Sequence, residues 1–162
     1  KEATKWYRLA AQQGYALAQF NLGGMYAIGS GVPTDHKEAV KWYKLAADQG
    51  NAQAQTNLGW MYQNGKGVPL DNNAAVKWYG LAAEQSFAQA QYNLGTMYYN
   101  GQGVLQDNLL AHMWINLSAA NGNEDAHKDR DLITKIMTSS AIEKAQAMAR
   151  KCMNSDYQDC GY

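Results

Sequence analysis

Tryptophan recurs along the chain at a fixed spacing. Consecutive members of the set are 36 residues apart: Trp6, Trp42, Trp78 and Trp114. Each lies in a version of one phrase, which reads Lys-Trp-Tyr-Lys-Leu-Ala-Ala at Lys41–Ala47. A period of roughly 20 to 50 residues is typical of repeat proteins, in which each unit buries its apolar face against its neighbours. The sequence therefore predicts an all-α solenoid of stacked units with no β-strand.

Each repeat is expected to form two antiparallel helices. The first carries Ala-Gln-x-Asn-Leu-Gly-x-Met-Tyr, as at Ala18–Tyr26, and the spacing of Ala18, Leu22 and Tyr26 predicts a buried helical stripe. A Gly-x-Gly then ends the helix, and an aspartate, a favoured N-cap residue, starts the second. The equivalent N-caps are Asp35, Asp71 and Asp107, and Asp35 with Glu38 matches the spacing of a capping box.

Glycine also recurs in the middle of the first helix, at Gly23, Gly59 and Gly95. Glycine inside a helix costs about 1 kcal/mol relative to alanine. Since the cost recurs in three repeats, we expect the missing Cβ to admit a bulky side chain from the helix opposite. The tryptophans of the second helix, Trp42, Trp78 and Trp114, are expected in the core because buried aromatic rings stabilise such stacks.

The 162 residues are expected to form a single repeat domain. Its parts are the second helix of a partial repeat, three full repeats, and a divergent C-terminal cap with a tail: 1–14, 15–50, 51–86, 87–122 and 123–162. Within the last part we expect a helix at Ala126–Met137, a second helix capped by Ser140 and Glu143, and a tail from Cys152. Because the chain opens inside a repeat at Lys1, we interpret it as a fragment, so a targeting signal cannot be read from it.

Composition argues against several classes of function. Lys plus Arg and Asp plus Glu number 14 each, and this neutral balance disfavours nucleic-acid binding. There is no apolar run of about 18 residues, so we expect no membrane span. The three histidines, His36, His112 and His127, occupy unrelated repeat positions, which disfavours a metal site. No nucleophile elbow or phosphate-binding fingerprint is present. We therefore expect no cofactor, no metal and no catalysis.

The only cysteines, Cys152 and Cys160, lie outside the repeats. They could be an inert free pair or a disulfide that closes a small loop; two thiols so close together would oxidise readily outside the cytosol. We predict the disulfide.

The recurring motifs resemble the Sel1-like repeat, a relative of the tetratricopeptide repeat, over roughly Lys1 to Gly122. The resemblance implies a right-handed superhelix of helix pairs that acts as an adaptor or scaffold for proteins or peptides. Bacterial members are commonly exported, so we expect a periplasmic or secreted protein, with the cytoplasm as the alternative. Some cysteine-rich members are linked to β-lactam binding or hydrolysis. A hydrolase is therefore the alternative function, although the repeats of this chain lack cysteine.

The resemblance also implies that the first helices line the concave face. On that face we expect a peptide-binding surface of aromatic and amide side chains: Phe20, Gln53, Thr56, Trp60, Gln63, Gln89, Tyr92, Thr96 and Tyr99. Trp60 stands out because Gly24 and Thr96 occupy the equivalent positions. The alternative is that Trp60 and Tyr92 pack on each other. Positions that grip a carboxylate in some tetratricopeptide grooves carry no lysine here, so we expect no carboxylate clamp.

Overall fold

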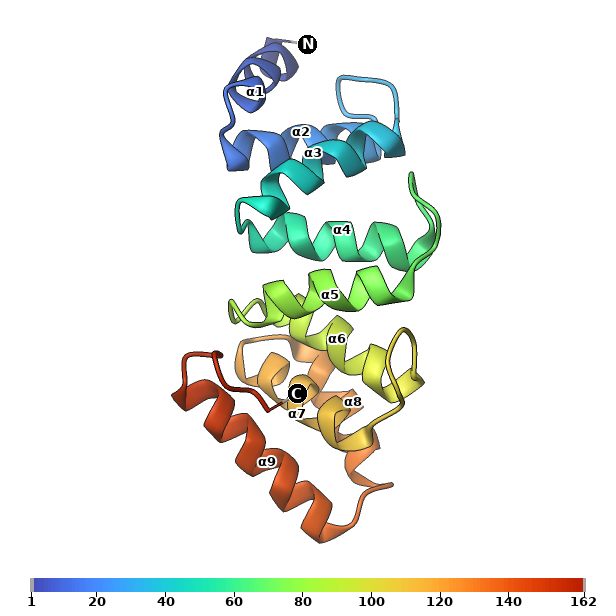
Figure 1. Ribbon diagram of the computed structural model, residues 1–162, viewed down its shortest axis with the longest axis vertical. Helices are drawn as coiled ribbons and strands as arrows, with labels where there is room; N and C mark the ends of the chain where they lie inside the picture. The colour runs from blue at the N-terminus through green and yellow to red at the C-terminus, as the bar shows by residue number, and fades with distance from the viewer. Residues whose placement is uncertain (1, 162) are drawn as a thin grey trace. The chain divides into compact units, whose positions relative to one another are not determined.

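The protein is all-helical in a computed structural model that describes residues 2–161 (Figure 1). Over these residues the chain forms nine helices and no strand. In chain order they are α1 (Glu2–Gln12), α2 (Ala16–Ile28), α3 (His36–Asp48), α4 (Ala52–Asn64), α5 (Asn72–Ala83), α6 (Ala88–Asn100), α7 (Asn108–Ala120), α8 (Glu124–Thr134) and α9 (Ser139–Asn154). The predicted fold class, an all-α repeat built from helix pairs with a 36-residue period, is confirmed.

The chain divides into two compact units, Lys1–Trp78 and Tyr79–Tyr162, with the boundary inside α5. The first unit holds α1 to α4 and the start of α5, and the second holds the end of α5 with α6 to α9. The expectation of a single continuous repeat domain stays a prediction.

Aspartate starts the second helix of the repeats, as predicted. One carboxylate oxygen of Asp35 accepts from the backbone N–H groups of Lys37 and Glu38 at 3.0 and 3.1 Å. Asp107 caps α7 in the same way. The predicted capping box is wrong, however, because the Glu38 carboxylate accepts from the Trp42 indole N–H at 3.1 Å. The backbone N–H of Asp35, which Glu38 would have capped, instead donates to the Tyr26 carbonyl.

Two of the mid-helix glycines, Gly23 and Gly95, lie against the second helix of their own repeat. A Cβ on Gly23 would lie 2.7 Å from the ring of Tyr43, and one on Gly95 would lie 2.6 Å from Cγ1 of Ile115. Neither distance leaves room for a methyl group, so the expected close approach is confirmed at these two positions. Gly59 is buried at the equivalent position of α4.

The core follows the predicted stripes of the second helices, but not at every tryptophan. Ala39, Tyr43 and Ala46 are buried, and Trp114 is 0% exposed. Trp42 and Trp78 are only half-buried and pack against the core from its edge, so the predicted core position is fully met at Trp114 alone. Lys41 lies 5.5 Å from the ring of Trp42, and Lys44 lies 5.8 Å from the ring of Trp78. These two tryptophans cover the edge of the core and carry cations on their outer faces.

The C-terminal segment is more ordered than its sequence suggested. Helix α9 continues to Asn154 and so includes Cys152, which corrects the predicted start of the tail at that residue. Its N-cap is Thr138 rather than Ser140, because the Thr138 hydroxyl accepts from the backbone N–H of Ala141 at 3.2 Å. Helix α8 begins at Glu124, two residues before the predicted start, because Asn123 supplies the cap.

The residues after α9 fold back onto the second unit. Cys152 and Cys160 are joined by a disulfide with their Cα atoms 4.2 Å apart, and both are buried. Between them, the Tyr157 hydroxyl lies 2.8 Å from the amide nitrogen of Asn121 at the end of α7. The disulfide therefore closes a short loop whose tyrosine is anchored to the preceding repeat.

Candidate protein-binding surfaces

In the first unit, Trp60 projects from α4 with 48% of its surface exposed. It borders a pocket of about 200 Å³ that Tyr43, Asn57, Ala27 and Met61 also line. The Tyr43 side chain is hydrogen-bonded to Asn57, and burial raises the pKa of the Tyr43 hydroxyl. The pocket floor is therefore an uncharged phenol at neutral pH. An exposed indole beside a small apolar pocket can contact a partner with both its ring and its N–H group.

The other predicted residues of this unit do not all reach the surface. Thr56 is 5% exposed, and its hydroxyl donates to the Ala52 carbonyl one turn earlier, so its prediction as an accessible contact is wrong. Phe20 is half-buried with its ring centroid 5.9 Å from that of Tyr43, so it mainly supports the pocket floor. Gln53 is exposed, and Gln63 is half-buried.

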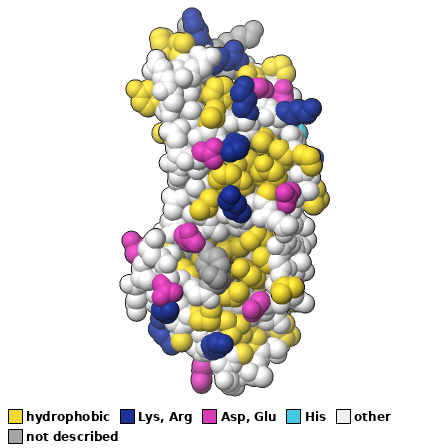
Figure 2. Space-filling model, viewed as in Figure 1, with side chains coloured by type: hydrophobic (Ala, Val, Ile, Leu, Met, Phe, Trp, Pro, Cys, Tyr) yellow, Lys and Arg dark blue, Asp and Glu magenta, His cyan; other side chains and the backbone are white. Residues whose placement is uncertain are grey.

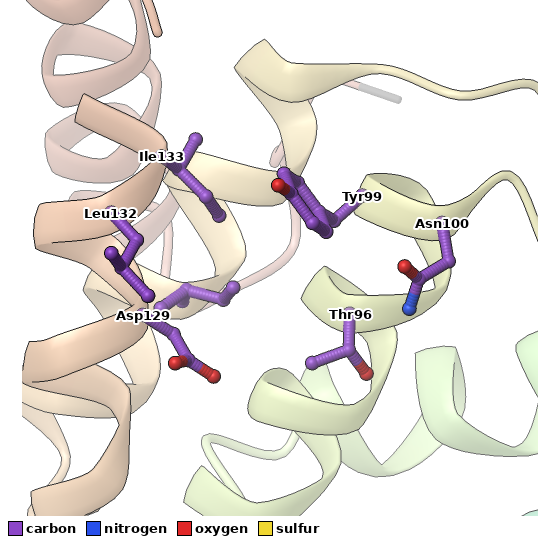
Figure 3. A pocket seen from close by; sticks show the side chains of 7 residues that line it. Thr96, Tyr99, Asn100, Asp129, Leu132 and Ile133 are labelled. Carbon is purple, nitrogen blue, oxygen red and sulfur yellow. The ribbon is translucent and has the colours of Figure 1, made fainter. Parts of the chain in front are cut away.

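In the second unit, two predicted residues of α6 line a separate pocket. Thr96 and Tyr99 form one wall of a space of about 220 Å³, with Asn100 beside them. Helix α8 supplies the facing wall, where the side chains of Asp129 and Leu132 lie across the space from α6 (Figure 3).

The remaining two predicted residues of this unit lie on α6, N-terminal to the pocket. The Tyr92 hydroxyl donates to a carboxylate oxygen of Asp129 at 2.6 Å. Gln89 is exposed and donates to the side chain of Asn93 at 3.0 Å. Tyr92 is thus tied to α8, and its ring and hydroxyl contribute to the helix contact as much as to the surface.

Asp129 is a site residue that our reading of the sequence missed. Its hydrogen bond with Tyr92, together with burial and the nearby Asp125, raises the pKa of the Tyr92 hydroxyl to about 12. The electrostatic potential around the Tyr92 hydroxyl is therefore negative. The sequence signal is weak because Asp129 lies in the middle of α8, outside the repeats, so no equivalent position in the other repeats marks it.

Charged side chains are dispersed over one face of the molecule. On the face shown in Figure 2, Lys and Arg are interspersed with Asp and Glu and form no basic stripe. Trp6 on α1 is a strongly exposed aromatic side chain of the first unit, at 69% exposure.

The histidines are dispersed as well. His112 is buried, and its Nε2 lies 3.1 Å from the Thr134 hydroxyl. Burial, with the nearby Arg130, lowers the pKa of His112, so its ring is neutral at physiological pH. Across the part of the chain that the structure describes, no three His, Cys, Asp or Glu side chains are grouped as metal ligands.

None of the helices within residues 2–161 is long and apolar enough to cross a bilayer.

Antiparallel helix pairs with a 36-residue period define a repeat protein of the tetratricopeptide-like class. The family model of the Sel1 repeat matches four consecutive segments of the chain, at residues 1–15, 16–51, 52–87 and 88–123. The chain therefore belongs to the Sel1 repeat family, whose members are generally protein-interaction scaffolds. A comparison with curated proteins found no match.

Solved structures support the same assignment. A Sel1 repeat protein from Oxalobacter formigenes is 39% identical, with a TM-score of 0.73, and the match covers 81% of this chain and 98% of that one. A second is c5321, described as a protective antigen of uropathogenic Escherichia coli strains displaying an SLR fold. It is 28% identical, with a TM-score of 0.74 over 98% of this chain. The match covers 42% of the c5321 chain.

Proposed function

We propose that this protein is a non-catalytic scaffold that binds a protein or an extended peptide through exposed side chains of the first helices of its repeats. The observation that carries the proposal is Trp60, an aromatic residue outside the repeat pattern that is 48% exposed beside a pocket. Binding hot spots are enriched in tryptophan, tyrosine and arginine. An indole that lies outside the repeat pattern, where a partner can reach it, fits such a role.

Exposed amide side chains on the first helices of both units support an extended ligand. Gln53 is exposed on the same helix, and Gln89 is exposed at the equivalent position of α6. A glutamine amide can both donate to and accept from a peptide backbone, which lets it bind extended chains of varied sequence. Each unit therefore offers an aromatic side chain and an amide to a partner.

The disulfide supports an extracytoplasmic location as part of this proposal. Structural disulfides persist in oxidising compartments and are rare in the cytosol. The Cys152–Cys160 bond is buried at the C-terminal end of the second unit. We place the protein in the periplasm or outside the cell, where its partner would also be found.

The experiment is selection of binding peptides from a display library, followed by calorimetric titration of a selected peptide against the wild type and Trp60→Ala. A scaffold that uses Trp60 loses affinity in the variant. Incubation with a chromogenic β-lactam tests the hydrolase alternative, which no observation on residues 2–161 favours. Turnover by the purified protein would overturn the non-catalytic part of the proposal.

A further inference from the structure

We propose that the pocket between α6 and α8 binds an arginine side chain of the partner polypeptide, held by the Asp129 carboxylate. This inference deepens the scaffold function and rests on it. The pocket lies wholly within the second unit, so it requires no contribution from the first.

The size of the pocket matches a single side chain. Its volume is about 220 Å³, below the roughly 300 Å³ at which pockets for small-molecule ligands begin. Apolar side chains form its walls, with Ile115 and Ile133 buried and Leu132 exposed at the rim. Such walls suit the aliphatic stem of a long charged residue, which packs on apolar surface while its head group finds a polar partner.

The negative charge of Asp129 favours a cationic ligand in this pocket. Asp129 is the only ionisable carboxylate or base that lines the pocket, and it is half-buried. The neighbouring Arg130 pairs with Asp131 at 3.0 Å and not with Asp129. Within residues 2–161, none of the ion pairs includes Asp129. A half-buried carboxylate without a counter-ion is costly to desolvate further unless the incoming group is positive.

The polar groups around Asp129 favour arginine. The Tyr92 hydroxyl occupies one lone pair of Asp129, and the other sites on the carboxylate remain able to accept hydrogen bonds. Across the pocket, Tyr99 offers an aromatic ring and Asn100 an amide oxygen (Figure 3). A guanidinium has five N–H donors in a plane, so it can reach more than one acceptor while stacking on a ring. An ammonium group lacks this planar geometry.

The probe for the test is a blocked arginine, N-acetyl-arginine-N-methylamide, added to the isotopically labelled full chain and followed by NMR. We expect saturable shifts at the amides of Thr96, Asn100 and Ile133, with a Kd on the order of 1 mM for a ligand of this size. The matching citrulline compound is neutral with nearly the same shape. We expect it to bind at least tenfold more weakly.

Two variants of α8 decide whether the Asp129 carboxylate binds the arginine probe. Asp129→Asn keeps an oxygen that can accept from Tyr92, so the helix contact is retained, and we expect at least a tenfold loss of arginine affinity. Glu124→Gln removes the same charge from the same helix at an exposed residue outside the pocket, and none of the ion pairs within residues 2–161 includes Glu124, so we expect no more than a twofold change. The pKa of Tyr92, about 12 in the wild type, should fall towards its ordinary value of about 10 in Asp129→Asn alone.

Three outcomes would each overturn the arginine pocket. They are equal affinity for the arginine and citrulline probes, equal losses of arginine affinity in the two variants, and no saturable shift in the wild type. None of these results would touch the scaffold function, which depends on peptide binding at Trp60. A wild type that binds arginine but selects no peptide would retain the pocket and contradict the scaffold.

Discussion

The side-chain amide of Gln91 donates to the backbone carbonyl of Ala83 at 3.1 Å, linking the start of one repeat to the end of the previous second helix. The same bond recurs from Gln19 to Ala11 at 3.2 Å and from Gln55 to Ala47 at 3.1 Å. Each carbonyl lies near a helix C-terminus, where the i+4 bond of the helix is missing and a backbone N–H three residues later donates to it at 2.9–3.1 Å. The repeated glutamine is therefore a cap that joins consecutive helix pairs.

The first prediction follows from this cap. Gln91→Met keeps the volume of the side chain but leaves the Ala83 carbonyl and the Asn121 amide, which donates to Gln91 at 2.9 Å, without that partner. We expect a loss of about 1–3 kcal/mol in the free energy of unfolding. Urea unfolding followed by circular dichroism measures it. Gln146→Met, at an exposed residue of α9, is the control, and an equal effect in both variants would contradict the capping role.

Much of this fold could be predicted because its signals are local and repeated. The helix starts at Asp35 and Asp107, and the close approaches at Gly23 and Gly95, depend on residues that recur at 36-residue spacing. The glutamine cap recurs in the same way, so its signal was present in the sequence. The capping role of the glutamine could not be predicted from the sequence, because a glutamine on a helix can equally face solvent.

The candidate site was harder to predict because it depends on contacts between non-equivalent elements. The pairing of Tyr92 with Asp129 joins a repeat helix to the divergent α8, whose position no periodicity specifies. Thr56 was assigned to the accessible face by its helical register, but its neighbours cover it. Trp42 and Trp78 share a repeat position with Trp114 yet only Trp114 is fully buried, because burial also depends on what packs outside the repeat.

The second prediction compares two adjacent glycines of α2. Gly23→Ala would bring a methyl group to 2.7 Å from the Tyr43 ring, whereas Gly24→Ala would meet only the Tyr43 hydroxyl, at 3.6 Å. We expect Gly23→Ala to destabilise the protein by about 1–3 kcal/mol through overpacking. Gly24→Ala should stabilise it by up to about 1 kcal/mol, the difference in helix propensity. Thermal unfolding of both variants measures the contrast, and effects of the same sign would refute the close-approach interpretation.

The third prediction concerns Ser86, which adopts a left-handed conformation with a φ of 59°. The equivalent residue one repeat earlier is Gly50, with a φ of 86° and no atom within 4 Å of a Cβ built there. Left-handed backbone costs a residue with a Cβ roughly 1–2 kcal/mol. Ser86→Gly should therefore raise the free energy of unfolding by about 1 kcal/mol, and Gly50→Ser should lower it similarly. A destabilised Ser86→Gly would show that the serine side chain contributes more than its backbone costs.

The fourth prediction concerns the disulfide. In the chain-entropy model, closing a loop of 8 residues stabilises the fold by about 2.5 kcal/mol. We expect Cys160→Ser to lose about this much, and we expect a reducing agent to destabilise the wild type but not the variant. Mass spectrometry of alkylated, non-reduced protein from an oxidising compartment checks the bond itself. Two alkylated thiols in that material would be incompatible with a structural disulfide.

The central claim is that Trp60 contacts a partner without being needed by the fold. The most direct measurement is calorimetric titration of a library-selected peptide against the wild type, Trp60→Ala and Trp6→Ala. Trp6 is a fitting control because it is also exposed, at 69%, but lies on α1 away from the Trp60 pocket. We predict that Trp60→Ala loses about 2 kcal/mol of binding free energy or more, about 30-fold in Kd, with a nearly unchanged melting temperature. Unchanged affinity in Trp60→Ala, or a collapse of its melting temperature, would contradict the claim.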